Sequence, residues 1–425
     1  MPRSNLNLRA HLCWLFVVQA ALLALAATEN AQALNPDAIA YCRIAGYYAA
    51  GQLDLAITGY WGPLLSWLMV PLFKLGCAPL AAARGVMALS GVVFLAGAVS
   101  AFRAFRLPPR AWLTGAWLAA LWSVFWSVRN ISPDLLLAGL VNFALAATLK
   151  EFFRPRGGER NSGGQTGSTA LTTGALWGLA YLAKAVALPL AFLFTASCVL
   201  LATWRDVPHR SGAARRLGLT WLALALVAGS WIGVLSRHYG KFTFSTTGPI
   251  AHALAGPGER ASYHPAMTTL HAPDAGRVTQ WEEPSRMAYA TWLPWASGEN
   301  FRRQLAVIAH NLTVMETWLS PWSSWLSNAP LPAWRRWLGA FDLLGLGAVA
   351  CALAASGAIF GWPRRLVRRW RAALLMVVLL AGLYLPFFVM VEDSRYFYPL
   401  WPGVWLFAVV IRPRGQAARK WLRRV

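Results

Sequence analysis

The chain has 425 residues, of which 57% are hydrophobic and 13% are charged, and its mean hydropathy is +0.45. Apolar runs of near-spanning length recur along most of it, which excludes a soluble globular protein and indicates an integral membrane protein. The net charge of +23 would fit a nucleic-acid partner, but most cations fall in segments on one side of the predicted spans. That is the positive-inside pattern of a multispanning protein, so we expect membrane lipids and no nucleic acid as partners.

The predicted architecture is an all-α polytopic membrane protein of about 10 transmembrane helices. Arg3 and Arg9 precede the first apolar run, which has no convincing cleavage site, so we expect a retained anchor with its N-terminus inside. The crossings are predicted at about residues 11–28, 81–101, 111–128, 135–150, 169–183, 185–203, 217–236, 337–360, 372–391 and 400–411. Both termini then lie in the cytoplasm.

The first outer loop, residues 29–80, carries the most informative stretch. Its Asn35-Pro36-Asp37 predicts a helix start, with Asn35 as the cap and proline in the first helical position. The positive end of the helix dipole then favours the charged form of the Asp37 carboxylate. Gly51 is expected to end this helix. One face should present, at helical spacing, a carboxylate followed by ring surfaces: Asp37, Tyr41, Ile44 and Tyr48.

A second apolar segment of the same loop begins at Tyr60-Trp61-Gly62-Pro63 and ends at Gly76. Its stretch from 63 to 76 is too short to cross about 30 Å of hydrocarbon. Counting it as a span would also move every later basic loop to the wrong side. We therefore expect it to lie in the outer interface.

Ser132-Pro133-Asp134, after the third predicted span, repeats the pattern of cap, proline and carboxylate. A single such tripeptide is commonly no more than a good helix start. Two of them at outer helix ends raise a second interpretation, in which Asp37 and Asp134 face one outer cavity.

Lys184 lies between the fifth and sixth predicted spans in an otherwise apolar setting. An unpaired ammonium in the bilayer costs about 2.5 to 3.5 kcal/mol on insertion scales. It either snorkels to the outer surface or forms an anion site between helices.

The outer turn from Glu392 to Tyr396 offers a late candidate pair. Arg395 could bind a phosphate with its forked guanidinium, with Tyr396 lining the adjacent groove, or it could form an interfacial salt bridge to Glu392 or Asp393. Arg84 and Arg129, at outer ends of spans, are further candidates.

The longest outer segment runs from 237 to 334 and contains a predicted amphipathic helix over 302–326, kinked at Pro321. We therefore divide the chain into a membrane module at 1–236, this large loop at 237–334, and C-terminal membrane helices with a basic tail at 335–425. Histidine and cysteine spacings match no zinc pattern, so no metal ligand is assigned. Cys42 and Cys77 share the outer side, and their pairing is left open.

Taken together, these features resemble the GT-C membrane glycosyltransferases, in the family-39-like and RgtA/B/C/D-like branch that includes aminoarabinose and protein mannosyl transferases. The resemblance covers roughly residues 10 to 410. It implies that Asp37 matches the first-loop catalytic acid and Asp134 the second-loop acid. Lys184 and Arg395 match positions associated with the donor phosphate. The remaining candidates for substrate binding are Tyr396, Arg84, Tyr41 and Tyr60.

The resemblance also implies a function. A sugar would move from a polyprenyl-phosphate donor to a lipid, glycan or protein acceptor on the periplasmic face of a bacterial inner membrane, as part of cell-envelope assembly. Asp37 would act as base or orienting carboxylate for the acceptor hydroxyl. Asp134 would hold sugar or acceptor hydroxyls or help place a metal, so the cofactor stays unknown. Many relatives have a Lys-Pro-Pro element where this chain has Trp61-Gly62-Pro63, so that lysine is absent.

Two other function classes compete with this hypothesis. A polytopic transporter or lipid-linked-glycan flippase would explain Lys184 and the basic loops equally well, but it predicts inverted repeats and polar residues near the bilayer midplane. No repeat is visible in the sequence. A non-enzymatic assembly factor leaves the two capped carboxylates unexplained.

Overall fold

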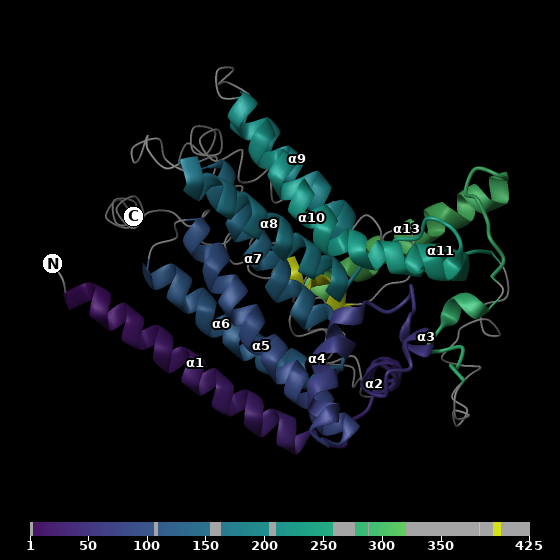
Figure 1. Ribbon diagram of the computed structural model, residues 1–425, viewed down its shortest axis with the longest axis horizontal. Helices are drawn as coiled ribbons and strands as arrows, with labels where there is room; N and C mark the ends of the chain where they lie inside the picture. The colour runs from purple at the N-terminus through teal and green to yellow at the C-terminus, as the bar shows by residue number, and fades with distance from the viewer. Residues whose placement is uncertain are drawn as a thin grey trace, which may run out of the picture.

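The computed structural model of the chain describes residues 3–105, 109–153, 163–203, 210–257, 277–287, 289–319, 382 and 394–400, and these contain helices and no strand. Figure 1 shows α2, α3, α11 and α13 gathered at one end of a helical bundle. The elements are α1 (Arg3–Glu29), α2 (Pro36–Ala49), α3 (Leu53–Ala56), α4 (Pro63–Lys74), α5 (Pro79–Ala104), α6 (Pro109–Arg129), α7 (Asp134–Phe152), α8 (Gly163–Ala183), α9 (Ala187–Thr203), α10 (Arg210–Tyr239), α11 (Thr247–Leu254), α13 (Gly298–Leu319) and the 3₁₀ helices η2 (Pro284–Arg286) and η3 (Ser394–Leu400).

The predicted all-α membrane architecture is confirmed. Four of the described helices are long and apolar enough to cross a membrane, namely Leu8–Glu29 within α1, α5, α7, and Gly212–Tyr239 within α10. The third, fifth and sixth predicted spans coincide with α6, α8 and α9. The last three predicted crossings lie almost entirely outside the described residues.

Small residues allow the long helices to approach closely. A Cβ placed on Gly97 of α5 would overlap the Gly139 carbonyl of α7, and one on Gly174 of α8 would overlap the Thr220 carbonyl of α10. Such close contacts replace the hydrophobic driving force that lipid cannot supply between helices. In addition, the Gln19 amide of α1 donates to the Gly91 carbonyl of α5 at 2.9 Å. The bundle is therefore held by close packing and by interhelical hydrogen bonds.

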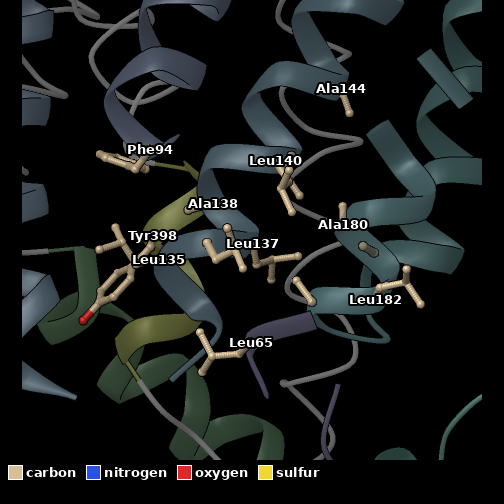
Figure 2. Close-up of a cluster of buried hydrophobic side chains, with 14 of the residues drawn as sticks. Leu65, Phe94, Leu135, Leu137, Ala138, Leu140, Ala144, Ala180, Leu182 and Tyr398 are labelled. Carbon is tan, nitrogen blue, oxygen red and sulfur yellow. The ribbon is translucent and has the colours of Figure 1, made fainter. Parts of the chain in front are cut away.

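The core extends to the end of the bundle where the outer loops gather. Figure 2 shows Leu65 of α4, Leu135 and Leu137 of α7, and Leu182 of α8 in one apolar cluster together with Tyr398 of η3. The Tyr398 ring stacks on Trp126 with 4.0 Å between centroids. The Asn142 amide also donates to the Pro399 carbonyl at 3.2 Å. These contacts dock η3 against α6 and α7.

The first outer loop folds largely as predicted. Gly51, the expected stop of its helix, has a φ of +73°, which favours glycine. The following α4 has twelve residues, too few to cross the bilayer, and buries Leu65 and Met69. Its Ser66 hydroxyl donates to the Tyr41 carbonyl of α2 at 2.9 Å. Both Cys42 and Cys77 carry free thiols.

The amphipathic helix differs from the prediction in its start and its orientation. α13 begins at Gly298 rather than 302, and Pro321 with the rest of the predicted range lies outside the described residues. Gln304 and Asn311 are buried, whereas Leu305 of the predicted apolar stripe is 49% exposed. A helix at the level of lipid can turn apolar side chains outward, because hydrocarbon solvates them.

Candidate active site

The first acidic residue lies where the sequence pattern predicted. Pro36 is the first residue of α2, Asn35 before it is extended, and Asp37 is in the first turn. The Asn35 side chain does not cap its own helix. Its Oδ1 instead accepts from the Ile131 N–H at 2.9 Å, and its Nδ2 donates to the Ile131 carbonyl at 3.4 Å. Asn35 therefore ties the loop that carries Asp37 to the loop before Asp134.

The second acidic helix begins one residue later than predicted. Pro133, expected in the first helical position, occupies the cap position of α7, and Asp134 is the first helical residue. Proline can take this place because its fixed φ of −75° suits a residue at the edge of a helix. The shift leaves Asp134 only 1% exposed.

Four predicted residues meet where α2 and α7 begin. Lys184 Nζ lies 2.6 Å from Asp134 Oδ1. The Arg395 guanidinium donates to Asp37 Oδ2, and its Nε lies 3.6 Å from Asp134 Oδ2. This ion-pair cluster, Asp37, Asp134, Lys184 and Arg395, contains two formal negative and two formal positive charges.

Each cation of the ion-pair cluster is placed by a different part of the fold. Lys184 lies in the short link between α8 and α9, and its N–H donates to the Ala180 carbonyl at 3.0 Å. Its Nζ lies 4.0 Å from the centroid of the Tyr396 ring. Of the two interpretations of Lys184, the geometry favours a residue directed at other charged groups over one that snorkels. Arg395 reaches the cluster because η3 docks against α7. Its alternative partners Glu392 and Asp393 lie outside the described residues.

Aromatic rings surround the approach to Asp37. Tyr41, Tyr60 and Trp281 all pack edge-to-face around Trp61, with centroid separations of 5.1, 4.8 and 5.1 Å. Burial raises the pKa of the Tyr41 phenol well above its ordinary value, and the nearby charges of Asp37 and Asp134 raise it further. Burial also raises the pKa of Tyr60, and the nearby charge of Asp37 adds to the rise. Both phenols are therefore neutral at physiological pH and can donate hydrogen bonds there.

Arg84 is not brought to the ion-pair cluster. Its buried guanidinium donates to the Val128 carbonyl at 3.0 Å, to the Ser127 carbonyl at 3.4 Å and to the Ala33 carbonyl. These acceptors are the last carbonyls of α6 and one in the loop before α2. Arg84 thus joins the end of α6 to the loop before α2, and the substrate contact expected for it stays a prediction.

Three buried residues beside the site were not predicted from the sequence. They are Trp281, Glu282 and Glu283, which are 5%, 1% and 3% exposed. The Tyr47 hydroxyl donates to Glu282 at 2.9 Å, and the Tyr239 hydroxyl donates to Glu283 at 2.9 Å. Burial raises the pKa of Glu283 despite these hydrogen bonds. The sequence feature that could have indicated these residues is a tryptophan followed by two acids, in a segment otherwise rich in Gly, Pro and His.

No metal-binding cluster is formed by the part of the chain that the structure describes, where no group of three or more His, Cys, Asp or Glu side chains is suitably arranged. The two site aspartates instead face cations.

Comparisons with known proteins identify the fold. No protein-family model matches the sequence, and no curated protein matches it. Among solved structures, the chain is similar to the crystal structure of ArnT from Cupriavidus metallidurans bound to undecaprenyl phosphate. The TM-score is 0.54 at 18% identity, over 96% of this chain and 61% of ArnT.

A second similar structure is the archaeal oligosaccharyltransferase AglB from Archaeoglobus fulgidus, in complex with an inhibitory peptide and a dolichol-phosphate. Its TM-score is 0.50 at 14% identity, over 94% of this chain and 50% of AglB. The chain thus spans only about half to three fifths of the length of these proteins. At such low identity the likeness concerns the fold alone: this chain shares its helical fold with ArnT and AglB, in agreement with the GT-C fold that its sequence resembles.

Proposed function

We propose that this protein is a membrane glycosyltransferase that moves a sugar from a polyprenyl-phosphate donor to an acceptor hydroxyl on the periplasmic face of the inner membrane. The observation that carries the proposal is the ion-pair cluster, which combines a partly accessible carboxylate with two cations at the outer ends of helices. The two similar structures support a donor class, because ArnT is bound to undecaprenyl phosphate and AglB is in complex with a dolichol-phosphate.

The reaction requires one bond to form and one to break. The acceptor oxygen attacks the anomeric carbon of the sugar while the bond from that carbon to the phosphate oxygen breaks. Asp37 accepts the hydroxyl proton, and the electron pair of the broken bond leaves on the lipid phosphate. Lys184 and Arg395 stabilise the charge that grows on this phosphate. A phosphate leaving group needs little protonation, which suits a site that offers cations.

The other side chains of the site support this chemistry. Asp134, buried against both cations, holds Lys184 and Arg395 in place between turnovers, and it can accept hydrogen bonds from substrate hydroxyls. Tyr41 and Tyr60 line the place of the sugar, and Tyr396 packs against Lys184. Arg84 ties the end of α6 to the loop before α2 and has no role with substrate in this scheme.

The orientation follows from charge. The ion-pair cluster lies at the α2 start, the α7 start and the α8–α9 link, whereas the basic residues Arg103 of α5 and Arg215 and Arg216 of α10 lie at the opposite ends of the helices. Under the positive-inside rule the basic side is cytoplasmic, which also puts the two termini in the cytoplasm.

A transporter or flippase is the second candidate, and the position of the charged groups argues against it. A transporter concentrates polar groups near the bilayer midplane at the junction of two repeats. Here Asp37 and Asp134 lie in the first turns of helices whose starts face outward, and Lys184 lies in an outer link.

Replacing Asp37 with Asn tests the function directly. The variant would be assayed in membranes of a deletion strain, supplied with undecaprenyl phosphate carrying radiolabelled glucose, mannose, galactose or arabinose. We expect transfer to fall on the order of 10²- to 10⁴-fold, the usual contribution of a general base. Binding of undecaprenyl phosphate should be retained, because Lys184 and Arg395 are intact. Transfer at the wild-type rate by Asp37→Asn would remove this residue from the mechanism.

A further inference from the structure

The helix that carries Asp37 is contacted at its first residue by a segment more than two hundred residues away in sequence. Trp281 Nε1 donates to the Pro36 carbonyl at 2.7 Å, directly before Asp37. The Trp281 carbonyl in turn accepts from Trp61 Nε1 at 2.9 Å. A carbonyl oxygen has two lone pairs, so Pro36 can accept this bond and its helical bond together. The backbone that precedes the carboxylate is therefore held by a buried indole.

The next residue, Glu282, holds the same helix near its middle. Its carboxylate pairs with Arg43, accepts from the Tyr47 hydroxyl at 2.9 Å, and accepts from the Thr279 N–H of its own turn at 2.9 Å. Arg43 also lies over the Tyr47 ring, 5.4 Å from its centroid. Trp281 and Glu282 thus contact α2 at two points along its length. Contacts at two points restrict the tilt of a helix more than a contact at one point does.

The third residue, Glu283, joins the segment to the rest of the bundle. The Tyr239 hydroxyl at the end of α10 donates to the Glu283 carboxylate at 2.9 Å. The same hydroxyl accepts from the Gly59 N–H at 2.8 Å. The Ser285 hydroxyl also donates to Glu283. The segment is therefore anchored on α10 on one side and holds α2 on the other.

We propose that residues 277–287 form a positioning strap that sets the orientation of the Asp37 carboxylate, with Trp281 as its main positioning residue. The inference rests on the proposed function, because it assigns Asp37 the role of base. Arg395 holds the Asp37 side chain from one side, and the Trp281 hydrogen bond holds its backbone from the other. Small displacements matter at such a site, since a misplacement of about 1 Å can cost on the order of 10²-fold in rate.

Trp281→Phe is the test, since it keeps an aromatic ring against Trp61 and removes the N–H donor together with part of the ring volume, a loss that the control below shares. We expect the maximal transfer rate at saturating donor to fall about tenfold, the loss of one net hydrogen bond that positions a reacting group. The KM for the donor should stay within about twofold, because no cation is touched. Membranes and labelled undecaprenyl-phosphate sugars would be those used for Asp37→Asn.

Trp292→Phe is the matched control. Trp292 lies in the same outer region, and its Nε1 donates to a backbone carbonyl, that of His252, at the same 2.7 Å. This bond holds α11 rather than α2, so its loss should leave the transfer rate at the wild-type value. Both variants remove one indole-to-carbonyl bond, and they differ in whether the bond reaches Asp37.

Three results would overturn the strap. Equal rates for Trp281→Phe and Trp292→Phe would show that the Pro36 bond does not matter. A raised donor KM with an unchanged maximal rate would make Trp281 part of donor binding. If Trp281→Phe fails to fold, Glu282→Gln tests the second anchor, and a wild-type maximal rate there would equally refute the proposal.

The strap and the proposed function fail in different ways. Normal transfer by Asp37→Asn would refute the function, whatever Trp281 does. Loss of transfer in Asp37→Asn with full transfer in Trp281→Phe would refute the strap alone.

Discussion

The two acidic tripeptides carry the same sequence pattern and end in different environments. The Asp37 side chain is 14% exposed and is paired with Arg395, whereas that of Asp134 is 2% exposed and faces both Lys184 and Arg395. Asp37 lies in the first turn of a short helix, whereas Asp134 is the first residue of a long helix that is almost entirely buried. The same local pattern thus leads to two different environments, according to what packs against it.

The largest expected difference between the two acids is in stability. Asp134→Asn should lower the free energy of unfolding by about 3 kcal/mol, because it leaves the two cations facing a buried neutral amide. Asp37→Asn should cost less than about 1 kcal/mol, since its side chain is more exposed. Thermal unfolding in detergent would measure both. Equal losses of unfolding free energy in the two variants would show that burial does not distinguish the two acids.

Removal of the Lys184 ammonium should weaken the binding of the lipid phosphate. Lys184→Met is expected to lower the affinity for undecaprenyl phosphate about tenfold or more, the usual worth of a charge-assisted hydrogen bond. Lys184→Arg, which keeps the charge beside Asp134, is the control and should retain most of the affinity. Undecaprenol, which lacks the phosphate, should bind both variants alike, and a similar loss for undecaprenol would point to general damage.

The tie between the two acidic loops can be broken by itself. Asn35→Ser keeps a good capping residue before α2 but is too short to form both bonds with Ile131. We expect a loss of about 1 kcal/mol in stability and a fall in transfer rate of a few-fold, because the two carboxylates are no longer held in register. A wild-type rate would show that other contacts, such as those of Arg84, suffice.

The smallest predicted effect concerns a third acid, Glu283. Its pKa is raised by burial above the ordinary value of 4.5, so the folded protein holds this proton more tightly than the unfolded chain does. The associated stability is present below pH 4.5 and is lost as the pH rises through the raised pKa. Glu283→Gln should therefore flatten the decline of melting temperature with rising pH in this range. An unchanged slope would assign that decline to other groups.

Much of the architecture could be predicted because it depends on local signals. Apolar run length and the side preference of cations predicted the spanning helices α1, α5, α7 and α10. Proline and glycine marked the start and end of α2. The pairing of Lys184 with Asp134 was not predicted, although both residues were named as candidates from the sequence.

Two expectations differ from the structure. Pro133 occupies the cap position of α7 instead of its first helical position, and α13 turns polar residues inward. Arg84 donates to three backbone carbonyls, which no local pattern encodes. Trp281 and its two acidic neighbours were missed because their partners Pro36, Arg43 and Tyr239 lie far away in the chain.

The amino-acid sequence by itself determined that this is a multispanning helical protein and that its two candidate acids lie at helix starts, because hydropathy and helix starts are local properties. Only the tertiary structure decided which acid meets which cation and which segment supports them. Those choices depend on close helix packing at glycines such as Gly97 and Gly139, and on the docking of η3 and residues 277–287. Contacts of this kind join residues that are far apart in the sequence, so no periodic pattern along the chain predicts them.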